Sequence, residues 1–363
     1  MDDFEGLGDV WDSLLSRSFD NDVFSTWEWL HCWWRHFGRG RDLRILVARD
    51  GGEIVGIAPL MLSKYNFLNF MGFKRMEFVG SPHSDYNNFI LLKRGRECVD
   101  LFLDYLLEEY DDWDCLELVD VREDSMTALS LEGIFNKGSL GLERSVATFC
   151  PYIKLPGSVD VFLRGLSRNM QRNLRKRMRR LKRDFRVEFR THEDFSSVKE
   201  AMGIFFKLHQ KRWRSRGRSG AFVDEEFRAF HMDVATLFAE RGWLSMFFLM
   251  ADGEPVASIY SFDYGGKKYG YLTGFDPDFY PYSVGNLLKM YAVERCIQKG
   301  LREYDLMRGF ERYKADWSTG LRRNFRVRLL RRGLFARLYN WATSNSLSCS
   351  LIEKLGVSLS CVG

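Results

Sequence analysis

The sequence predicts an α/β protein made of two related units, each with a mixed sheet and flanking helices. Residues 269–317 have the pattern of strand, loop, helix, strand and short helix, which is the order of a parallel crossover unit. The segment VARDGGEIVGIAPL in the first half aligns with LMADGEPVASIYSF in the second, with one glycine inserted. In both halves a strand, a loop, a helix and a strand follow this hairpin. A repeated order of elements indicates an internal duplication.

The length of 363 residues is sufficient for roughly two domains with their own cores. We therefore expect an N-terminal unit at 1–150, a C-terminal unit at 151–342 and a loosely ordered tail at 343–363. The N-terminal unit is expected to be the shorter one and to lack a helix that begins with a glycine.

In the first half, apolar side chains at helical spacing predict a helix at 24–37. A hairpin is predicted at 43–62, around the turn DGG. A helix at 99–110 and a strand at 115–121 follow.

In the second half, 269–275 is predicted to be a strand, which Asp276-Pro277 and Pro281 end. The next helix has apolar residues at 284, 287, 288, 291 and 292, and a strand at 301–307 follows it. Because the helix starts at the carboxyl end of a strand, its first amides can bind a pyrophosphate. We expect these amides to be those of Val284, Gly285 and Asn286. The alternative is that Ser283 only caps an ordinary helix.

Residues 158–186 are predicted to form one long amphipathic helix. Its polar face is almost purely cationic, with Arg164, Arg168, Arg172, Arg175, Lys176, Arg179, Arg180 and Arg183. Crowded like charges destabilise a helix unless an anion faces them. The segment 160–186 therefore predicts a phosphorylated, tRNA or anionic membrane partner. The alternative is a solvated face whose arginines reach acidic residues elsewhere.

The composition is that of an ordinary globular protein, and the net charge of +5 indicates no particular partner. The seven cysteines form no CxxC pair and the six histidines form no HxxxH pair, so we expect neither a metal site nor a disulfide framework. No basic and apolar leader opens the sequence, and no apolar run approaches the ~18 residues that span a bilayer. These features predict a cytoplasmic protein.

Four segments taken together resemble the acetyltransferase domain of the CelD-like (cellulose biosynthesis) family in the GNAT superfamily: RNMQRNLRKRMRRL, ADGEPVASIYSF, YGYLTGFDPDFYPYSVGNLL and REYDLMRGFERYKADW. They are more distantly similar to FemAB-type peptidoglycan aminoacyl transferases, which carry two GNAT units in tandem. The resemblance covers 155–317 well and the first unit only in outline. It implies a tandem GNAT-like acyl-CoA N-acyltransferase fold.

The resemblance also implies a binding site for acetyl-CoA as co-substrate. In this family the pantetheine lies along a splayed strand and the pyrophosphate rests on the next helix start. Matched by motif, the donor-binding residues are Leu272, Thr273, Gly274, Ser283, Val284, Gly285 and Asn286. The family pattern is Arg/Gln-x-x-Gly-x-Gly/Ala, and 282–286 has one glycine in its place. Because of this departure, aminoacyl-tRNA remains an alternative to acetyl-CoA as the donor.

Acyl transfer to an amine requires a base, because an ammonium with a pKa near ~10.4 must lose a proton before it attacks. Tyr313 matches the GNAT tyrosine that reprotonates the leaving thiolate. Asp305 is the expected base and Asp276 is its rival. A backbone amide near Leu272 or Thr273 is expected to stabilise the oxyanion. Substrate contacts are expected from Tyr271, Arg308 and Lys314. Each role has an alternative. Tyr313 would be a core aromatic and Asp276 only a turn residue. Asp305 would pair with an arginine, and Arg308 and Lys314 would be solvated cations.

Three functions remain open at this point. The first is N-acyl transfer from acetyl-CoA to an amine of a sugar, polysaccharide or cell-envelope precursor. The second is a FemAB-type transfer from aminoacyl-tRNA. The third is a non-catalytic scaffold for polysaccharide synthesis.

Overall fold

The computed structural model describes residues 2–67, 71–92, 94–110, 112–135 and 142–331. Internal contacts divide the chain into two units, which are described separately. Residues 1–148 and 323–363 form the first unit, and 149–322 form the second. The first boundary lies close to the expected one. The described residues of the last strand from 323 onwards fold with the first unit, although they were expected in the second. The tail 343–363 lies outside the described residues.

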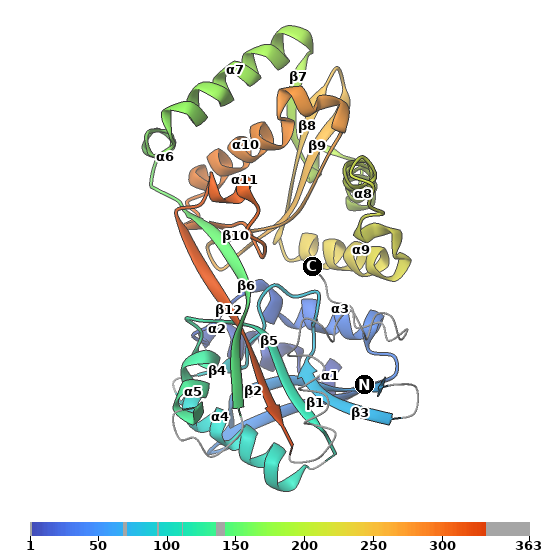
Figure 1. Ribbon diagram of the computed structural model, residues 1–363, viewed down its shortest axis with the longest axis vertical. Helices are drawn as coiled ribbons and strands as arrows, with labels where there is room; N and C mark the ends of the chain where they lie inside the picture. The colour runs from blue at the N-terminus through green and yellow to red at the C-terminus, as the bar shows by residue number, and fades with distance from the viewer. Residues whose placement is uncertain (1, 68–70, 93, 111, 136–141, 332–363) are drawn as a thin grey trace. The chain divides into compact units, whose positions relative to one another are not determined.

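The first unit combines a mixed sheet with flanking helices (Figure 1). Its strands are ordered β1-β2-β3-β5-β12, with β4 paired to β2. Its elements are α1 (Asp2–Glu5), α2 (Gly8–Arg17), η1 (Val23–Ser25), α3 (Trp27–Phe37), β1 (Arg41–Asp50), β2 (Glu53–Phe67), β3 (Met71–Phe78), β4 (Ile90–Leu91), α4 (Gly95–Asp104), η2 (Tyr105–Glu109), β5 (Cys115–Arg122), α5 (Met126–Phe135), the start of β6 (Leu142–Lys154) and most of β12 (Gly320–Leu330).

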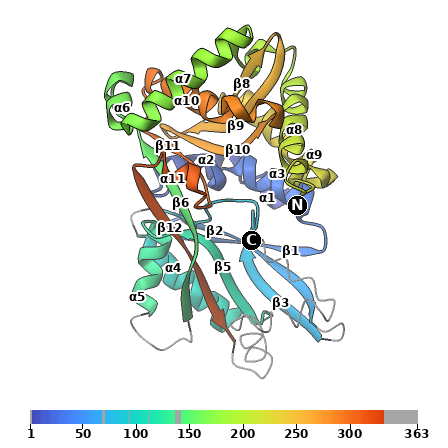
Figure 2. The same cartoon turned by 45° about the horizontal axis from the view of Figure 1, so that its top comes forward.

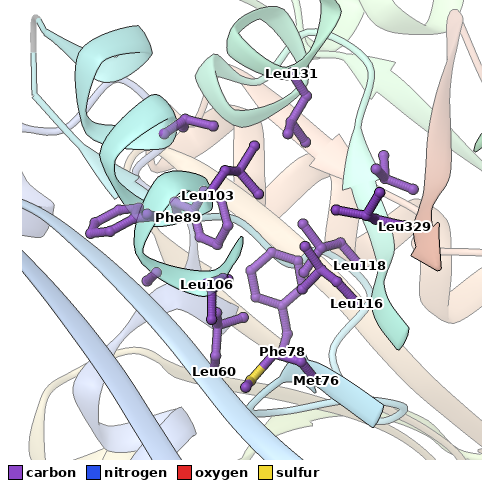
Figure 3. Close-up of a cluster of buried hydrophobic side chains, with 14 of the residues drawn as sticks. Leu60, Met76, Phe78, Phe89, Leu103, Leu106, Leu116, Leu118, Leu131 and Leu329 are labelled. Atoms are coloured by element: carbon purple, nitrogen blue, oxygen red, sulfur yellow. The ribbon is translucent and has the colours of Figure 1, made fainter. Parts of the chain in front are cut away.

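The core of the first unit lies between this sheet and helices α4 and α5. Leu103 and Leu106 point from the helical side toward strand residues that include Leu60 and Leu116 (Figure 3). Each side chain is at most 2 % exposed, and burying a leucine stabilises a fold by about 1.5–3 kcal/mol. The elements predicted at 24–37, 43–62, 99–110 and 115–121 are all present, with bounds shifted by a few residues.

The second unit also has a mixed sheet, with the order β6-β11-β10-β9-β8-β7. Strands β10 and β11 pair in parallel, and the neighbouring pairs on both sides are antiparallel. Its elements are the end of β6, α6 (Val159–Gly165), α7 (Arg168–Asp184), β7 (Val187–Thr191), η3 (His192–Asp194), α8 (Val198–Arg214), η4 (Ala221–Val223), α9 (Glu225–Glu240), β8 (Leu244–Ala251), β9 (Glu254–Tyr264), β10 (Lys267–Phe275), η5 (Pro277–Tyr282), α10 (Val284–Gln298), β11 (Glu303–Asp305), α11 (Arg312–Ala315) and the start of β12.

Both predicted DG hairpins are present and turn in the same way. Gly51 and Gly52 have φ values of 55° and 91°, and Asp252 and Gly253 have values of 50° and 85°. Two consecutive residues at positive φ are typical of the type I′ turn that joins tightly paired strands. Glycine, or aspartate beside glycine, adopts this conformation at low cost.

Helices cover both faces of the sheet in the second unit (Figures 1 and 2). Side chains of successive strand residues point to opposite faces. Ile259 belongs to the core that α10 completes, whereas the ring of the next residue, Tyr260, contacts Phe205 of α8 and lies near His231 of α9. Helix α10 therefore covers one face, and helices α8 and α9 cover the other.

The predicted single helix at 158–186 is wrong, because the chain forms two helices, α6 and α7. Leu166, between them, is extended with φ −73° and ψ 147°. The Ser167 side chain accepts a hydrogen bond from the amide of Met170 at 3.2 Å and so caps a new helix. The apolar spacing continues across the break, but glycine at 165 and a serine cap favour a helix end there. The strand predicted at 301–307 is shorter, at Glu303–Asp305.

Among the described residues, no helix combines the length and the apolar character that crossing a bilayer requires.

Candidate active site

The start of α10 is shaped by the short segment that leaves β10. Asp276 accepts a hydrogen bond from the amide of Asp278 at 3.1 Å and caps η5. Ser283 then adopts a left-handed conformation, with φ 54° and ψ 43°, and turns the chain into α10. The Ser283 side chain does not cap the helix. Its hydroxyl accepts a hydrogen bond from Arg177 of α7 instead.

Two of the three expected amides remain open at this helix start. The amide of Asn286 donates to the Ser283 carbonyl at 2.9 Å, so the expectation that it is free is wrong. The tight first turn of the helix brings this carbonyl within reach. No hydrogen bond within the described residues engages the amides of Val284 and Gly285. These two amides are available to an anion.

Strands β10 and β11 separate next to this helix start. Their parallel pairing covers only 267–269 and 303–305. From Leu272 to Phe275, β10 pairs only with β9. A bulge, in which Gly270 and Tyr271 lie opposite one residue of β9, twists β10 at the point of separation. The strands thus splay, as the resemblance implied, and one backbone edge of β10 faces a cavity.

The cavity between the splayed strand and α10 has a volume of about 350 Å³. Its lining brings together the helix start from Ser283 to Asn286 and the strand residues Thr273 and Phe275. Four cationic side chains also line it, namely Arg177, Arg212, Arg216 and Lys289. Among the described residues of the lining there is no carboxylate. This charge distribution favours an anionic ligand.

Lys289 is the most unusual of these cations, because its side chain is only 5 % exposed. Burial lowers its pKa to about 7, and the positive charges of Lys314 and Arg212 act in the same direction against the weaker effect of Glu311. Its Nζ lies 4.4 Å from the centre of the Tyr313 ring. No hydrogen bond or ion pair within the described residues engages this amine. At neutral pH, Lys289 is therefore an amine that can exchange a proton inside the cavity.

Arg212 of α8 reaches the exposed edge of the splayed strand. Its Nη1 donates to the Thr273 carbonyl at 3.0 Å and to the Thr273 hydroxyl at 2.7 Å. Burial lowers the pKa of this guanidinium, and an interaction with Tyr313 raises it. The Thr273 carbonyl therefore already accepts a hydrogen bond from Arg212, where it could otherwise accept one from an extended ligand on β10.

Six of the residues predicted from the sequence line the cavity: Thr273, Ser283, Val284, Gly285, Asn286 and Tyr313. The Asn286 side chain is held by a hydrogen bond from the Trp317 indole at 3.1 Å. Phe162 of α6 stacks on Trp317, with their ring centres 6.4 Å apart. Trp317 and Phe162 therefore pack against the start of α10 and hold it in place.

Leu272, Gly274 and Tyr271 lie on the other face of β10. Leu272 pairs with Tyr260 in the strand register, so its side chain is directed toward α8 and α9. Gly274 passes so close to α8 that a Cβ atom there would lie 2.5 Å from the amide nitrogen of His209. The Tyr271 ring lies 5.1 Å from the His231 ring. Their side chains therefore do not line the cavity.

Neither aspartate that was expected as the base lines the cavity. Asp305 is 2 % exposed, accepts a hydrogen bond from the Met307 amide at 2.8 Å and pairs with Arg322 at 3.3 Å. Asp276 pairs with Lys211 of α8. Both carboxylates are thus engaged in holding the backbone and neighbouring cations.

Lys314 and Arg308 also lie outside the lining. The Lys314 amine is buried and donates to the carbonyls of Met307 and Arg308, at 3.2 and 2.6 Å. It also pairs with Glu311 at 3.1 Å. Lys314 therefore holds the loop that follows β11.

Sequence reasoning missed the four cations of the cavity. Lys289 had a signal, because its helical neighbours Val293 and Cys296 are apolar and a lysine between them interrupts a buried face. Arg212 and Arg177 had none, because each joins the site from a separate helix through tertiary packing.

The cationic face of α7 is exposed, which the solvated alternative expected. Arg180 and Arg183 pair with Asp184, at 3.9 and 2.8 Å. Arg168, Arg175 and Arg179 have no carboxylate partner among the described residues. The exposure of this face and the pairs with Asp184 belong to the solvated alternative, and an anionic partner for the remaining cations stays a prediction.

Comparisons with known proteins agree with this geometry. Residues 168–315 match the sequence model of the family described as acetyltransferase (GNAT) domain. No curated protein sequence matches the chain.

Three solved structures have a similar fold at low sequence identity. The structure of FemX is 12 % identical with a TM-score of 0.67, and the match covers 92 % of this chain and 98 % of that one. The C-terminal domain of an Agrobacterium fabrum protein, provisionally named a lysylphosphatidylglycerol synthetase, is 12 % identical with a TM-score of 0.56 over 96 % and 97 % of the two chains. A conserved protein of unknown function from Bacteroides thetaiotaomicron is 11 % identical with a TM-score of 0.56 over 88 % and 96 %.

The splayed strands, the open helix start and the family match thus coincide in one stretch of the chain. Residues 168–315 match a GNAT acetyltransferase domain, and they lie within a mixed α/β fold of the GNAT type.

Proposed function

We propose that this protein is an N-acyltransferase that moves an acyl group, in the simplest case acetyl, from coenzyme A to an amine. The observation that supports the proposal is the cavity itself. Two open amides of α10, the edge of a splayed strand and four cations surround it, with no carboxylate among the described lining residues. Such a site suits a donor that combines phosphates with an extended amide chain.

The proposed position of the donor follows from these groups. Its pyrophosphate would rest on the amides of Val284 and Gly285, with Arg177 and Arg216 beside it. A Cβ atom on Gly285 would meet only Phe275, at 3.7 Å, so internal packing does not require this glycine. That freedom agrees with a role in leaving room for a ligand.

Lys289 and Tyr313 are the proposed proton carriers. The amine attacks the carbonyl carbon of the thioester, so that a C–N bond forms and the C–S bond breaks. The proton lost by nitrogen passes to the Lys289 amine, whose lowered pKa makes it a base near neutral pH. The Tyr313 hydroxyl gives a proton to the leaving thiolate, and protonated Lys289 restores it. Lys289 thus replaces Asp305 and Asp276 in the proposed mechanism.

For the acceptor we propose an amine on a sugar, a polysaccharide or a cell-envelope precursor. The support is the CelD-like and FemAB-type resemblance of the sequence, together with the FemX-like fold. The cytoplasm as its location stays a prediction.

Calorimetry with acetyl-CoA tests the donor. We expect saturable binding that inorganic pyrophosphate and 3′,5′-ADP both weaken, since the proposed contacts are to the pyrophosphate and 3′,5′-ADP carries one of its two phosphates. A panel of amino sugars then tests turnover by release of free thiol. Absence of binding at millimolar acetyl-CoA would remove coenzyme A from the proposal.

One observation favours a second candidate, an aminoacyl-tRNA-dependent transferase. Arg212 already binds the Thr273 carbonyl, which a pantetheine amide would need. In this alternative the terminal nucleotide of the tRNA would meet the cationic cavity. Transfer from charged tRNA to a cell-wall precursor, with no binding of acetyl-CoA, would support it.

A further inference from the structure

A second concave surface of the second unit lies between α7, α10 and β7, outside the proposed donor cavity. This surface is called the α7–α10 groove here, and its volume is about 450 Å³. Helices α7 and α10 run beside each other in both views (Figures 1 and 2). The floor is apolar and consists of Leu174, Met178, Phe189, Leu287, Met290 and Tyr291. All of these except Leu287 keep part of their side chain accessible.

The outer border of the groove is cationic. Arg175, Arg179 and Lys182 of α7 line it, and all three are exposed. None of them has a carboxylate partner among the described residues. Because they are three and four positions apart, they lie in a row along one side of the helix. An apolar floor thus runs beside a row of unpaired positive charges.

Two acidic groups lie near this row. Glu294 of α10 lines the groove, and burial raises its pKa, so a low-dielectric ligand favours its neutral form. Asp184 lies near the end of α7 and is engaged by Arg180 and Arg183. The net charge along the border therefore stays positive.

We propose that the α7–α10 groove docks the protein on an anionic membrane. An acyl chain would occupy the apolar floor, and lipid phosphates would meet Arg175, Arg179 and Lys182. An RNA would use the cations and leave the apolar floor exposed to water. An anionic lipid uses both parts, which is the combination of apolar burial and basic residues that holds peripheral proteins on membranes. This inference does not depend on which donor the cavity binds.

Binding to lipid vesicles tests the docking surface. The full chain is mixed with phosphatidylcholine vesicles that contain or lack phosphatidylglycerol, and sedimentation measures the bound fraction. We expect binding only with phosphatidylglycerol. The triple variant Arg175→Glu, Arg179→Glu and Lys182→Glu should bind at least about 100-fold more weakly, since the loss of each basic side chain at an anionic surface costs about fivefold and the new carboxylates are repelled by the lipid phosphates.

The matched control reverses three cations elsewhere on α7, at Arg168, Arg172 and Lys176, which are exposed and do not line the groove. Circular dichroism verifies that both variants are folded. The control should lose clearly less affinity than the groove variant. Equal losses would show a diffuse electrostatic attraction without docking in the groove, and would overturn the proposal.

The apolar floor is tested separately. The double variant Met178→Gln and Met290→Gln keeps the charge and the side-chain length, and should bind phosphatidylglycerol vesicles at least tenfold more weakly. In the variant Met290→Trp, brominated lipid should quench a larger share of the fluorescence than in the unsubstituted protein, whose ten tryptophans give the background. If the protein does not bind these vesicles but binds tRNA through the same three cations, the groove is a nucleic-acid-binding surface and the lipid proposal fails.

Discussion

Lys289 is a buried cation that marks the candidate site, on a helix face that is otherwise apolar. A lysine on the inner side of a helix is costly, because burial disfavours its charged form. The folded chain keeps it where the cavity, Tyr313 and two further cations meet. Neutral Lys289 can therefore be a base in a place where no carboxylate among the described residues lines the cavity.

Replacing Lys289 by methionine should stabilise the protein in a pH-dependent way. The pKa of Lys289 falls from 10.5 to about 7 on folding. Below pH 7 both states bind the proton, so the folded state bears the full cost of burying a charge. Each unit of pKa shift corresponds to about 1.4 kcal/mol, so the gain should reach up to about 5 kcal/mol at pH 6 and vanish above pH 10.5. Urea unfolding across this pH range measures it.

In activity assays the same variant should lose about 10²–10⁴-fold in kcat, with the limb near pH 7 removed from the rate profile. Lys289→Arg keeps a permanent charge and should not restore the rate. A Lys289→Met enzyme with an unchanged pH profile would show that the base lies elsewhere.

Replacing Gly285 by alanine should separate ligand binding from folding. The new methyl group would lie 3.7 Å from Phe275, an ordinary contact, and alanine favours a helix over glycine by about 0.5–1 kcal/mol. The fold should therefore be as stable or slightly more stable. A phosphate on the neighbouring amide would meet the methyl group, and we expect about a tenfold loss of acetyl-CoA affinity by calorimetry. Unchanged affinity would place the phosphates away from this helix start.

At the scale of elements, the close approach of α8 to β10 explains why glycine stands at 274. A side chain there would meet backbone atoms of His209 and Leu208, at 2.5 and 2.8 Å. The two elements cannot separate easily, because Arg212 also joins α8 to Thr273. This packing determines which face of β10 is turned toward α8 and away from the cavity.

Gly274→Ala should therefore destabilise the protein by about 1–3 kcal/mol, because the methyl group overpacks this contact. Gly203→Ala, in the interior of α8, is the control. A Cβ atom there would meet nothing within 4 Å, so alanine should stabilise α8 by about 0.5–1 kcal/mol. Thermal or urea unfolding compares the two. If both variants changed the stability by the same amount and in the same direction, α8 would not press on β10 as described.

The elements also show what the sequence can predict. The hairpins at Gly51-Gly52 and Asp252-Gly253 were predictable, because turn chemistry is local. The start of α10 was predictable for the same reason. The break at Ser167 was missed, since apolar periodicity continues across it, and a side-chain cap outweighed that pattern. Arg177 and Arg212 reach the cavity from separate helices, and spacing along a sequence carries no information on such contacts.

At the scale of the whole molecule, each unit contains a buried group whose charge opposes folding. In the first unit, burial raises the pKa of Asp20 from 3.8 to about 6, although the amide of Met126 donates to this carboxylate at 2.6 Å. In the second unit the corresponding group is Lys289. The two lie in different units with different cores.

Asp20→Asn should therefore stabilise the protein above pH 6 by up to about 3 kcal/mol, at about 1.4 kcal/mol per pKa unit. The gain should disappear as the pH falls from 6 to 3.8, where both states bind the proton. Calorimetry should find the affinity for acetyl-CoA unchanged, because the cavity belongs to the second unit. In the double variant with Lys289→Met the two gains should add. A strong deviation from additivity would reveal coupling between the units.

The hydrogen bond from Arg177 to Ser283 has a consequence for regulation. Arg177 lines the cavity between the splayed strand and α10, while Arg175 and Arg179 of the same helix border the α7–α10 groove. Because all three arginines belong to one rigid helix, any shift of α7 on docking would also move Arg177 in the cavity. Attachment to a bilayer and binding of the proposed donor would then be thermodynamically linked, and each would change the affinity of the other by the same factor.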